Sequence, residues 1–379
     1  MFKQLTVLAL AVAAAARKCH NVTVPISISS QNAVFDLKAP TTEIEVSNFF
    51  LRFTRQGSDY SKELQKGYRT IQGDYEIAGT YCEPDSGPGH ALQIMTHGVG
   101  FDRSYWDIPF HNHNYSYVAR AVDEHGYSTF TWDRLGVGQS SRGEPVNEIQ
   151  VHLEIAALKE LTARLAEGQV CGVGAKFPPG KTVHIGHSFG SVMTYNLVNQ
   201  NPGISGAVVL TGFSQIPNFM DQFALGGNFA PVSANRALAA SYPAGYIAPA
   251  SSIGMHINFL SPGEFDPQML EYASATGQPA SPGELLTVGA GTSAKNAFAG
   301  PVMIITGEYD VPFCGGDCKG MSGLAKEEFP NLIAASAPFF DKASVFNATV
   351  VPSAGHSLNM AYSMQTTYAM MLDFIGRYL

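Results

Sequence analysis

The segment GHSFG at 186–190 has the residue types and spacing that best fit covalent catalysis. It follows a predicted β-strand at 182–185, and a helical pattern begins near Ser191. A sharp turn from strand to helix needs small residues on both sides, and it lifts the middle side chain above the edge of the sheet. This context predicts Ser188 as a nucleophile, and the alternative is a tight turn with a buried serine.

A serine hydroxyl is a weak nucleophile unless a base removes its proton. His356 is the histidine best placed to be that base. It lies in AGHS at 354–357, after the last predicted strand and before the C-terminal helical pattern, where a loop can reach back to Ser188. The alternative is a surface or helix-capping histidine.

A catalytic histidine needs a carboxylate that selects its tautomer and stabilises its charged form. Asp310 ends the segment TGEYD at 306–310, which follows a predicted strand. It precedes His356, so that the chain order is Ser, Asp, His. Glu308 is the nearest alternative, but we expect its side chain to face away or to pair elsewhere.

The oxyanion that forms when a carbonyl is attacked needs backbone N–H donors that are already in place. Phe189 follows the nucleophile and supplies the first donor. The loop THGVG at 96–100 follows an early predicted strand and supplies the second. We place that donor at Val99, with Gly98 and Gly100 as alternatives, and expect His97 to hold the loop.

Short β-rich runs alternate with helical patterns from residue 75 onward. Several of the runs are continuously apolar, as in parallel strands that are covered on both faces. This alternation predicts an α/β protein with a mostly parallel central sheet flanked by helices. The predicted strands are 75–81, 92–96, 128–132, 182–185, 207–211, 302–306 and 348–351, and the predicted helices are 117–124, 148–167, 191–199 and 362–377.

The segment 214–299 interrupts this alternation. It is rich in Gly, Pro, Phe and Met, shows no clear strand and is too long for a loop, which predicts an inserted, mainly helical cap. Its aromatic and Met residues either line an apolar pocket or form ordinary core. The predicted organisation is a signal peptide at 1–16, an N-terminal extension packed on the core at 17–74, core at 75–213, the cap at 214–299 and core at 300–379. The apolar residues concerned are Phe213, Phe219, Met220, Phe223, Phe229, Met255, Phe259 and Phe265.

Five segments, HGVG, DRLGVGQS, GHSFG, GEYD and GH, follow successive predicted strands in this order. As a set they resemble the α/β-hydrolase superfamily, and most closely its soluble esterases and lipases with a helical cap. The resemblance runs from about residue 75 to the C-terminus. It implies Ser188 as nucleophile, Asp310 as acid, His356 as base, and Phe189 and Val99 as oxyanion donors. Relatives with an aspartate nucleophile, such as epoxide hydrolases, are disfavoured because the turn carries a serine.

The expected reaction is hydrolysis of a carboxylic ester, with a hydrophobic group, through an acyl-serine intermediate. It needs no organic cofactor and no metal, and neither a CxxC pair nor HxxxH spacing supports a zinc site. Opening of a lactone and transfer of the acyl group to an alcohol use the same three residues. Ligand binding without turnover and lyase chemistry are alternatives of another class, because a fold alone does not determine function.

The N-terminus has the pattern of a secretory signal peptide. Lys3 precedes an apolar run at 5–16, broken only by Thr6, and small residues at 14–16 predict cleavage after Ala16. The run is shorter than the roughly 20 residues that span a bilayer, although a retained anchor is the alternative. No later stretch resembles it, so we expect a secreted chain without stable membrane insertion.

The sequons at Asn21, Asn114 and Asn347 predict N-glycosylation and agree with secretion. The net charge of −8, with no basic run, argues against nucleic acid as a partner and leaves a small ester or lactone. No pattern in the sequence defines an oligomeric state.

The five cysteines predict disulfide bonds in a secreted chain. Cys314 pairs with Cys318 across a glycine-containing loop, and Cys19 near the mature terminus pairs with Cys82 after a predicted strand. Cys171 is then left unpaired.

Overall fold

The computed structural model describes residues 17–215, 219–320 and 329–379. The predicted signal peptide at 1–16 lies outside these residues.

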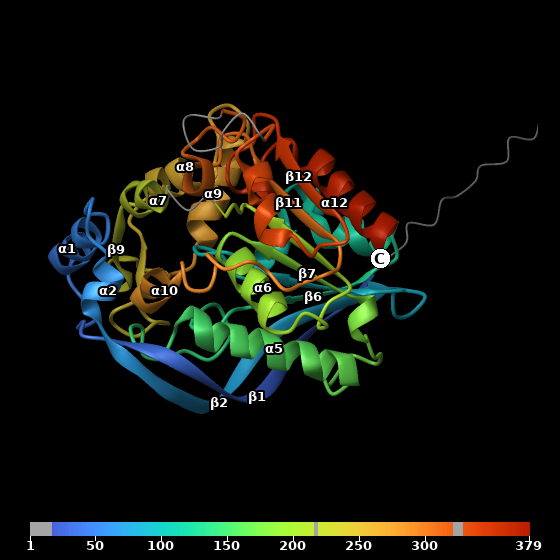
Figure 1. Ribbon diagram of the computed structural model, residues 1–379, viewed down its shortest axis with the longest axis horizontal. Coiled ribbons are helices and arrows are strands. Elements are labelled where there is room, and N and C mark those ends of the chain that lie inside the picture. Colours follow the sequence, from blue (N-terminus) through green and yellow to red (C-terminus); the bar gives the residue numbers. More distant parts are fainter. Residues whose placement is uncertain (1–16, 216–218, 321–328) are drawn as a thin grey trace, which may run out of the picture.

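An eight-stranded sheet forms the centre of the molecule (Figure 1). Its strand order is β1-β2-β6-β3-β7-β8-β11-β12. Every pair from β6 to β12 is parallel, whereas β1 with β2 and β2 with β6 are antiparallel. The sheet is therefore mostly parallel, as predicted. The strands are β1 (Arg17–Phe35), β2 (Gln65–Pro84), β3 (Leu92–Thr96), β6 (Ser128–Trp132), β7 (Thr182–His187), β8 (Ala207–Thr211), β11 (Val302–Gly307) and β12 (Phe346–Val351).

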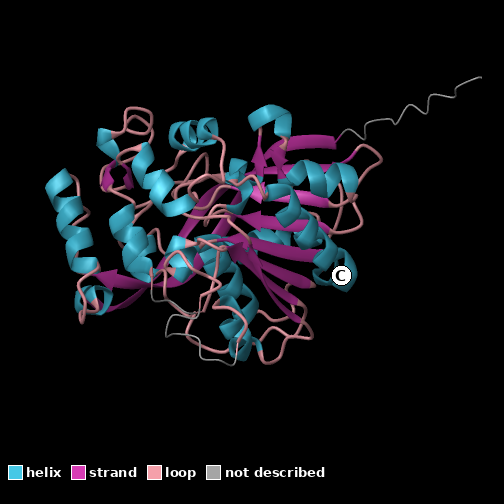
Figure 2. Cartoon of the chain, turned by 90° about the horizontal axis from the view of Figure 1, so that it is seen from above, coloured by secondary structure: helices cyan, strands magenta, loops and turns pink. Residues whose placement is uncertain are grey.

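The inner strands β3, β6, β7, β8 and β11 are buried at every residue. Helices α5 (Val151–Glu167) and α6 (Phe189–Gln200) lie side by side on one face of the sheet in Figure 1. Figure 2 shows helices on both sides of the strands, and α12 (Met364–Tyr378) ends the chain. Burial on both faces explains why β8 and β11 are almost continuously apolar rather than alternating.

The N-terminal part of the chain belongs to the same sheet. The predicted strand 75–81 is the inner part of the 20-residue strand β2, and β1 pairs with β2 along its whole length. The predicted boundary between residues 74 and 75 therefore falls inside one strand. In Figure 1 this two-stranded ribbon runs below α5, and helices α1 (Glu43–Phe53) and α2 (Tyr60–Leu64) connect its strands.

The segment 214–299 connects β8 to β11, which are neighbours in the sheet. In its described part the regular structure is mainly helical, but loops make up more than half of the residues. It also contains two paired strands of three residues each, which are too short to show a pattern in the sequence. In Figure 1 its helices α7 and α10 gather on the same side of the sheet as α1 and α2, and they contact them. Its elements are α7 (Met220–Gly226), β9 (Phe229–Pro231), η4 (Val232–Ala234), β10 (Ile247–Pro249), α8 (Ser252–Phe259), α9 (Pro267–Thr276) and α10 (Pro282–Thr287).

Short elements make up most of the remaining connections. The predicted helix 117–124 is one α-helical turn, α4 (Tyr117–Ala119), continued by the π-helical turn η2 (Arg120–Glu124). Within the described ranges, no helix combines the length and apolar character that crossing a membrane requires. The other elements are η1 (Arg103–Trp106), β4 (Asp107–Ile108), α3 (Phe110–His113), β5 (Tyr115–Ser116), η3 (Pro179–Lys181), α11 (Val311–Cys314), η5 (Ile333–Phe340) and η6 (Leu358–Met360).

Candidate active site

Ser188 occupies a strained turn between β7 and α6. Its φ of 54° and ψ of −118° are unusual for a residue with a side chain, and such conformations cluster at functional sites. Its N–H donates to the carbonyl of Thr211 (2.9 Å), and its own carbonyl accepts the N–H groups of Ser191 and Val192. Hydrogen bonds at both peptide groups therefore hold Ser188 where the strand turns into the helix.

The glycines on both sides of Ser188 are required by close backbone contacts. A Cβ at Gly186 would lie 2.4 Å from the carbonyl oxygen of Gly190. A Cβ at Gly190 would lie 2.2 Å from the carbonyl oxygen of Thr96, on the neighbouring strand β3. This is the physical reason for the small residues from which the turn was predicted.

His356 and Asp310 form a buried hydrogen-bonded pair. Nδ1 of His356 lies 2.7 Å from Oδ2 of Asp310, and both residues are at most 1% exposed. The carboxylate also accepts the hydroxyl of Thr306 and, at 2.9 Å, the N–H of Phe313. Nε2 of His356 is buried and has no hydrogen-bond partner in the described part of the chain, which leaves this nitrogen free to accept a proton.

The pair lies next to Ser188. Thr211, which accepts the N–H of Ser188, precedes Gly212, whose Cβ would lie 2.8 Å from Cε1 of His356. The ring centroids of His187 and His356 are 4.8 Å apart. The structure thus gathers Ser188, Asp310 and His356 from the ends of three strands, β7, β11 and β12.

Glu308 is separate from this cluster, although it stands only two residues from Asp310. Its carboxylate forms an ion pair with Lys319 (2.7 Å) and accepts the N–H of Ser353 (2.9 Å). The hydrogen bond to Lys319 lowers the pKa of Glu308. The side chain of Glu308 therefore pairs with Lys319 and not with His356, as expected for the alternative to Asp310.

Aromatic rings enclose the two histidines. The ring of His356 stacks on Phe259 (5.9 Å between centroids) and on Phe313 (5.7 Å), and Tyr105 stacks on His187 (4.4 Å). Phe259 belongs to the apolar set noted in the sequence, whereas Phe313 and Tyr105 were not anticipated. Phe313 lies three residues after Asp310, which is the one local signal that could have identified it.

The loop 96–100 lies against the nucleophile. A Cβ at Gly98 would lie 2.8 Å from Cβ of Ser188, so only glycine allows this approach. Val99 is buried, and Gly100 has a φ of +87° that favours glycine. Of the two predicted oxyanion donors, Phe189 follows Ser188 in the chain, and Val99 lies in the loop that contacts Ser188.

The neutral imidazole of His97 stabilises this loop through two hydrogen bonds. Its Nε2 accepts the backbone N–H of Arg134 (3.1 Å), so Nδ1 carries the proton and donates to the carbonyl of Gly98 (2.8 Å). Burial lowers the pKa of His97 well below its ordinary value. The expected structural role agrees with these contacts.

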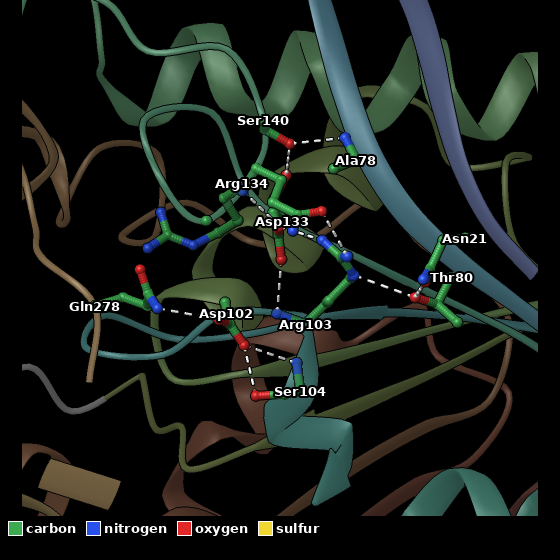
Figure 3. A network of polar contacts seen from close by, with 12 residues as sticks. Asn21, Ala78, Thr80, Asp102, Arg103, Ser104, Asp133, Arg134, Ser140 and Gln278 are labelled. Carbon is green, nitrogen blue, oxygen red and sulfur yellow. Dashed lines mark hydrogen bonds and ion pairs between the residues drawn. The ribbon is translucent and has the colours of Figure 1, made fainter. Parts of the chain in front are cut away.

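The turn after β6 is held by the polar network in Figure 3. The carboxylate of Asp133 accepts the N–H groups of Arg103 and Gln139 and pairs with the Arg103 guanidinium. Ser140 donates its hydroxyl to the carbonyl of Asp133 (2.6 Å). A Cβ at Gly138 would lie 2.3 Å from this carboxylate. Gly138 therefore serves a tight turn, where its φ of +58° also favours glycine.

An apolar cavity of about 620 Å³ lies beside the turn that carries Asp310. Leu260 and Pro262, which follow α8, form one wall, and Tyr309 and Val311 on either side of Asp310 form another. Within the described residues, no group of three His, Cys, Asp or Glu side chains is arranged to hold a metal ion.

The structure contains the two expected disulfide bonds, Cys19–Cys82 and Cys314–Cys318, and Cys171 is free and exposed. The three sequon asparagines, Asn21, Asn114 and Asn347, are all exposed.

Residues 93–366 match the model of the alpha/beta hydrolase family. The match spans more than half of the chain, and the chain belongs to this family. No match is found among curated protein sequences.

Three solved structures share the fold at low sequence identity. A thermophilic esterase from Thermogutta terrifontis is 14% identical with a TM-score of 0.53, and the match covers 81% of this chain and 96% of that one. An alpha/beta hydrolase fold protein from Chitinophaga pinensis is 14% identical with a TM-score of 0.51, and covers 80% and 94%. An epoxide hydrolase from Vigna radiata is 14% identical with a TM-score of 0.50, and covers 80% and 95%. At this identity the likeness establishes the fold alone.

Proposed function

We propose that this alpha/beta hydrolase is a serine hydrolase that cleaves carboxylic esters through an acyl-serine intermediate. The observation that carries the proposal is the buried hydrogen bond between Asp310 and His356 beside the strained turn of Ser188. Serine, neutral imidazole and buried carboxylate are the groups that acyl transfer by a serine requires.

In the proposed mechanism, Oγ of Ser188 attacks the ester carbonyl while Nε2 of His356 takes the hydroxyl proton. Asp310 stabilises the imidazolium that forms, and the N–H groups of Phe189 and Val99 bind the oxyanion. His356 then gives the proton to the leaving alcohol. Water, activated by the same histidine, attacks the acyl-serine and releases the acid. The missing partner of Nε2 fits this cycle, because catalytic hydrogen bonds are often long before substrate binds.

We infer that the ester carries a hydrophobic group. The cavity beside Asp310 is apolar and falls within the usual volume range of small-molecule sites. The rings of Phe259 and Phe313 on the base also favour an apolar substituent near the reacting carbonyl. A panel of short, long and aromatic esters, with lactones and added acceptor alcohols, distinguishes hydrolysis from lactone opening and acyl transfer.

A fluorophosphonate probe tests the nucleophile. We expect the purified protein to be labelled and Ser188→Ala to be unlabelled, because the probe phosphonylates an activated serine oxygen. Ser191→Ala is the matched control: it removes a buried hydroxyl from the same helix, one that donates to Thr211, and should keep its labelling.

Two results would contradict the proposal. Wild-type protein that resists the probe would exclude an activated serine. Labelling without turnover of any ester or lactone in the panel would instead indicate a ligand-binding protein.

We also infer that the chain is secreted after cleavage at Ala16. Two disulfide bonds and three exposed sequon asparagines support this inference. Protein recovered from the medium should begin at Arg17, and an endoglycosidase should lower its mass. Each of Asn21→Gln, Asn114→Gln and Asn347→Gln should remove one glycan. A cell-retained protein that keeps Met1 and carries no glycan would refute the inference.

A further inference from the structure

Arg134 is the centre of a buried ion cluster that the proposed mechanism does not use. Its guanidinium Nη1 donates to Glu154 (2.6 Å) and to Glu284. The three side chains are at most 1% exposed. They come from the turn after β6, from helix α5 and from helix α10 of the segment 214–299, so that residues far apart in the chain meet at one cation.

In this cluster a single guanidinium group, that of Arg134, interacts with two carboxyl groups, those of Glu154 and Glu284. Burial alone would lower the pKa of Arg134, but the two carboxylates outweigh it and raise that pKa. Burial raises the pKa of Glu154 well above its ordinary value, against the attraction of Arg134. Removal of any member of the cluster therefore leaves charge or polar groups buried without compensation.

The same arginine touches both arms of the proposed oxyanion hole. Its Cζ lies 4.7 Å from the ring centroid of Phe189, the residue whose N–H is the first donor. Its Nη2 is 3.5 Å from the carbonyl oxygen of Gly98, which precedes the second donor, Val99. Its backbone N–H donates to Nε2 of His97, and Nδ1 of His97 donates to the same carbonyl of Gly98.

Helix α10 is anchored so that Glu284 cannot move freely. Ser281 and Glu284 form a reciprocal capping box at the start of α10, and the Ser281 hydroxyl donates to the carbonyl of Ile149. Farther along α10, the hydroxyl of Thr287 accepts the N–H of Val151, the first residue of α5. The position of Arg134 therefore depends on contacts between the segment 214–299 and α5.

We propose that Arg134 is a positioning residue that fixes the positions of both oxyanion donors, the N–H groups of Phe189 and Val99. Through the ion pair between Arg134 and Glu284, these positions depend on the segment 214–299. The proposal rests on the proposed function. Donors must be held to within about 0.5 Å of the productive geometry, and a residue in contact with both Phe189 and Gly98 can impose that limit. Lysine cannot replace it, because a single ammonium group lacks the planar fork that reaches two glutamates, a ring face and a carbonyl at once.

The test compares Arg134→Lys and Glu284→Ala with Arg103→Met. We expect Arg134→Lys to lower kcat about 10- to 100-fold, the range for a misplaced oxyanion donor, with KM changed less than about threefold. Glu284→Ala should lower kcat in the same direction. Glu284→Gln, whose single amide oxygen replaces only one of the two acceptors used by Ser281 and Arg134, should lower it less than Glu284→Ala. The rate constant of fluorophosphonate labelling should fall in parallel with kcat.

Arg103→Met is the matched control. Arg103 pairs with Asp133, the residue next to Arg134, and its side-chain hydrogen bonds go to Asp133, Thr80 and Gln139 rather than to Phe189 or Gly98. The Arg103→Met substitution should lower the melting temperature of the protein and leave kcat within about threefold of wild type. A merely structural cluster would lower stability without this split between kcat and KM.

Two outcomes would overturn the proposal. Folded Arg134→Lys and Glu284→Ala that keep wild-type kcat would show that the donors do not depend on the cluster. An equal loss of kcat in Arg103→Met would show general loosening of the turn. If Arg134→Lys does not fold, the proposal is judged on Glu284→Ala and Glu284→Gln, by whether kcat falls while KM changes little. Failure of the proposed function would appear differently, as wild-type protein that the probe does not label.

Discussion

Asp310 and Glu308 show how two carboxylates that stand two residues apart acquire different chemistry. Asp310 caps helix α11, is fully buried and faces His356. Glu308 is bound by the ammonium group of Lys319 and by the N–H of Ser353. The difference comes from the direction in which each side chain leaves the turn after β11, since both follow the same strand.

Asp310→Asn should lower kcat by at least about 10³-fold, because the amide would favour the wrong tautomer of His356 and could not stabilise its charged form. Glu308→Gln, the matched control, should stay within about threefold of wild type. Steady-state kinetics on the best ester of the panel measures both. A large loss in Glu308→Gln with full activity in Asp310→Asn would reverse the assignment.

At the scale of elements, the two disulfide bonds hold different parts of the molecule. Cys314–Cys318 closes the turn that carries Asp310, where the N–H of Gly316 also bonds to the carbonyl of Asp310 (2.9 Å). Cys19–Cys82 joins opposite residues of β1 and β2, which are 63 positions apart. The first bond lies beside the candidate site, and the second closes the long N-terminal ribbon.

Loop length predicts that loss of Cys19–Cys82 costs more stability than loss of Cys314–Cys318. Chain entropy gives about 4 kcal/mol for the long loop and about 2 kcal/mol for the short one. Urea unfolding of the paired serine variants, C19S/C82S and C314S/C318S, measures both costs. We expect only C314S/C318S to lower kcat as well, because it loosens the turn of Asp310. Equal kcat in the two folded variants would contradict that expectation.

At the scale of the whole molecule, buried histidines link stability to pH. Burial lowers the pKa of His97 and of His187 well below the ordinary value of 6.5, and lowers that of His184 to about 3. Below pH 6.5 the unfolded chain binds protons at these positions and the folded chain does not, so stability is present above pH 6.5 and is lost as the pH falls. Burial raises the pKa of Glu154 and of Asp133, and these groups act in the opposite direction.

His184→Gln isolates one of these contributions at a core histidine four residues before Ser188 on β7. His184 bonds to Thr162 (3.0 Å) and Ser205 (2.9 Å) within the core. Between pH 6.5 and pH 5 wild type should lose about 2 kcal/mol more stability than the variant, at about 1.4 kcal/mol per pH unit for one proton. Chemical unfolding at several pH values measures the two slopes, and parallel slopes would show that His184 is already protonated in the folded chain.

Features that depend on neighbours in the chain were predictable from the sequence alone. The glycines around Ser188 and the apolar runs of β8 and β11 are local patterns, because a strand, a tight turn or a helix start leaves its mark within a few residues. Ser188, Asp310 and His356, which follow β7, β11 and β12, are far apart in the chain, so their roles stay a prediction from the motifs that carry them. The two strands of three residues, β9 and β10, are too short to leave such a mark.

Only the tertiary structure decided which distant residues meet. The sheet places β3 between β6 and β7, and this order brings the loop of Gly98 against Ser188. The rings of Tyr105 and Phe313 on the two histidines and the cluster of Arg134 with Glu154 and Glu284 depend on how separate elements pack. Such contacts leave no periodic signal, because each partner is compatible with many neighbours until the strand order and the packing of helices select one.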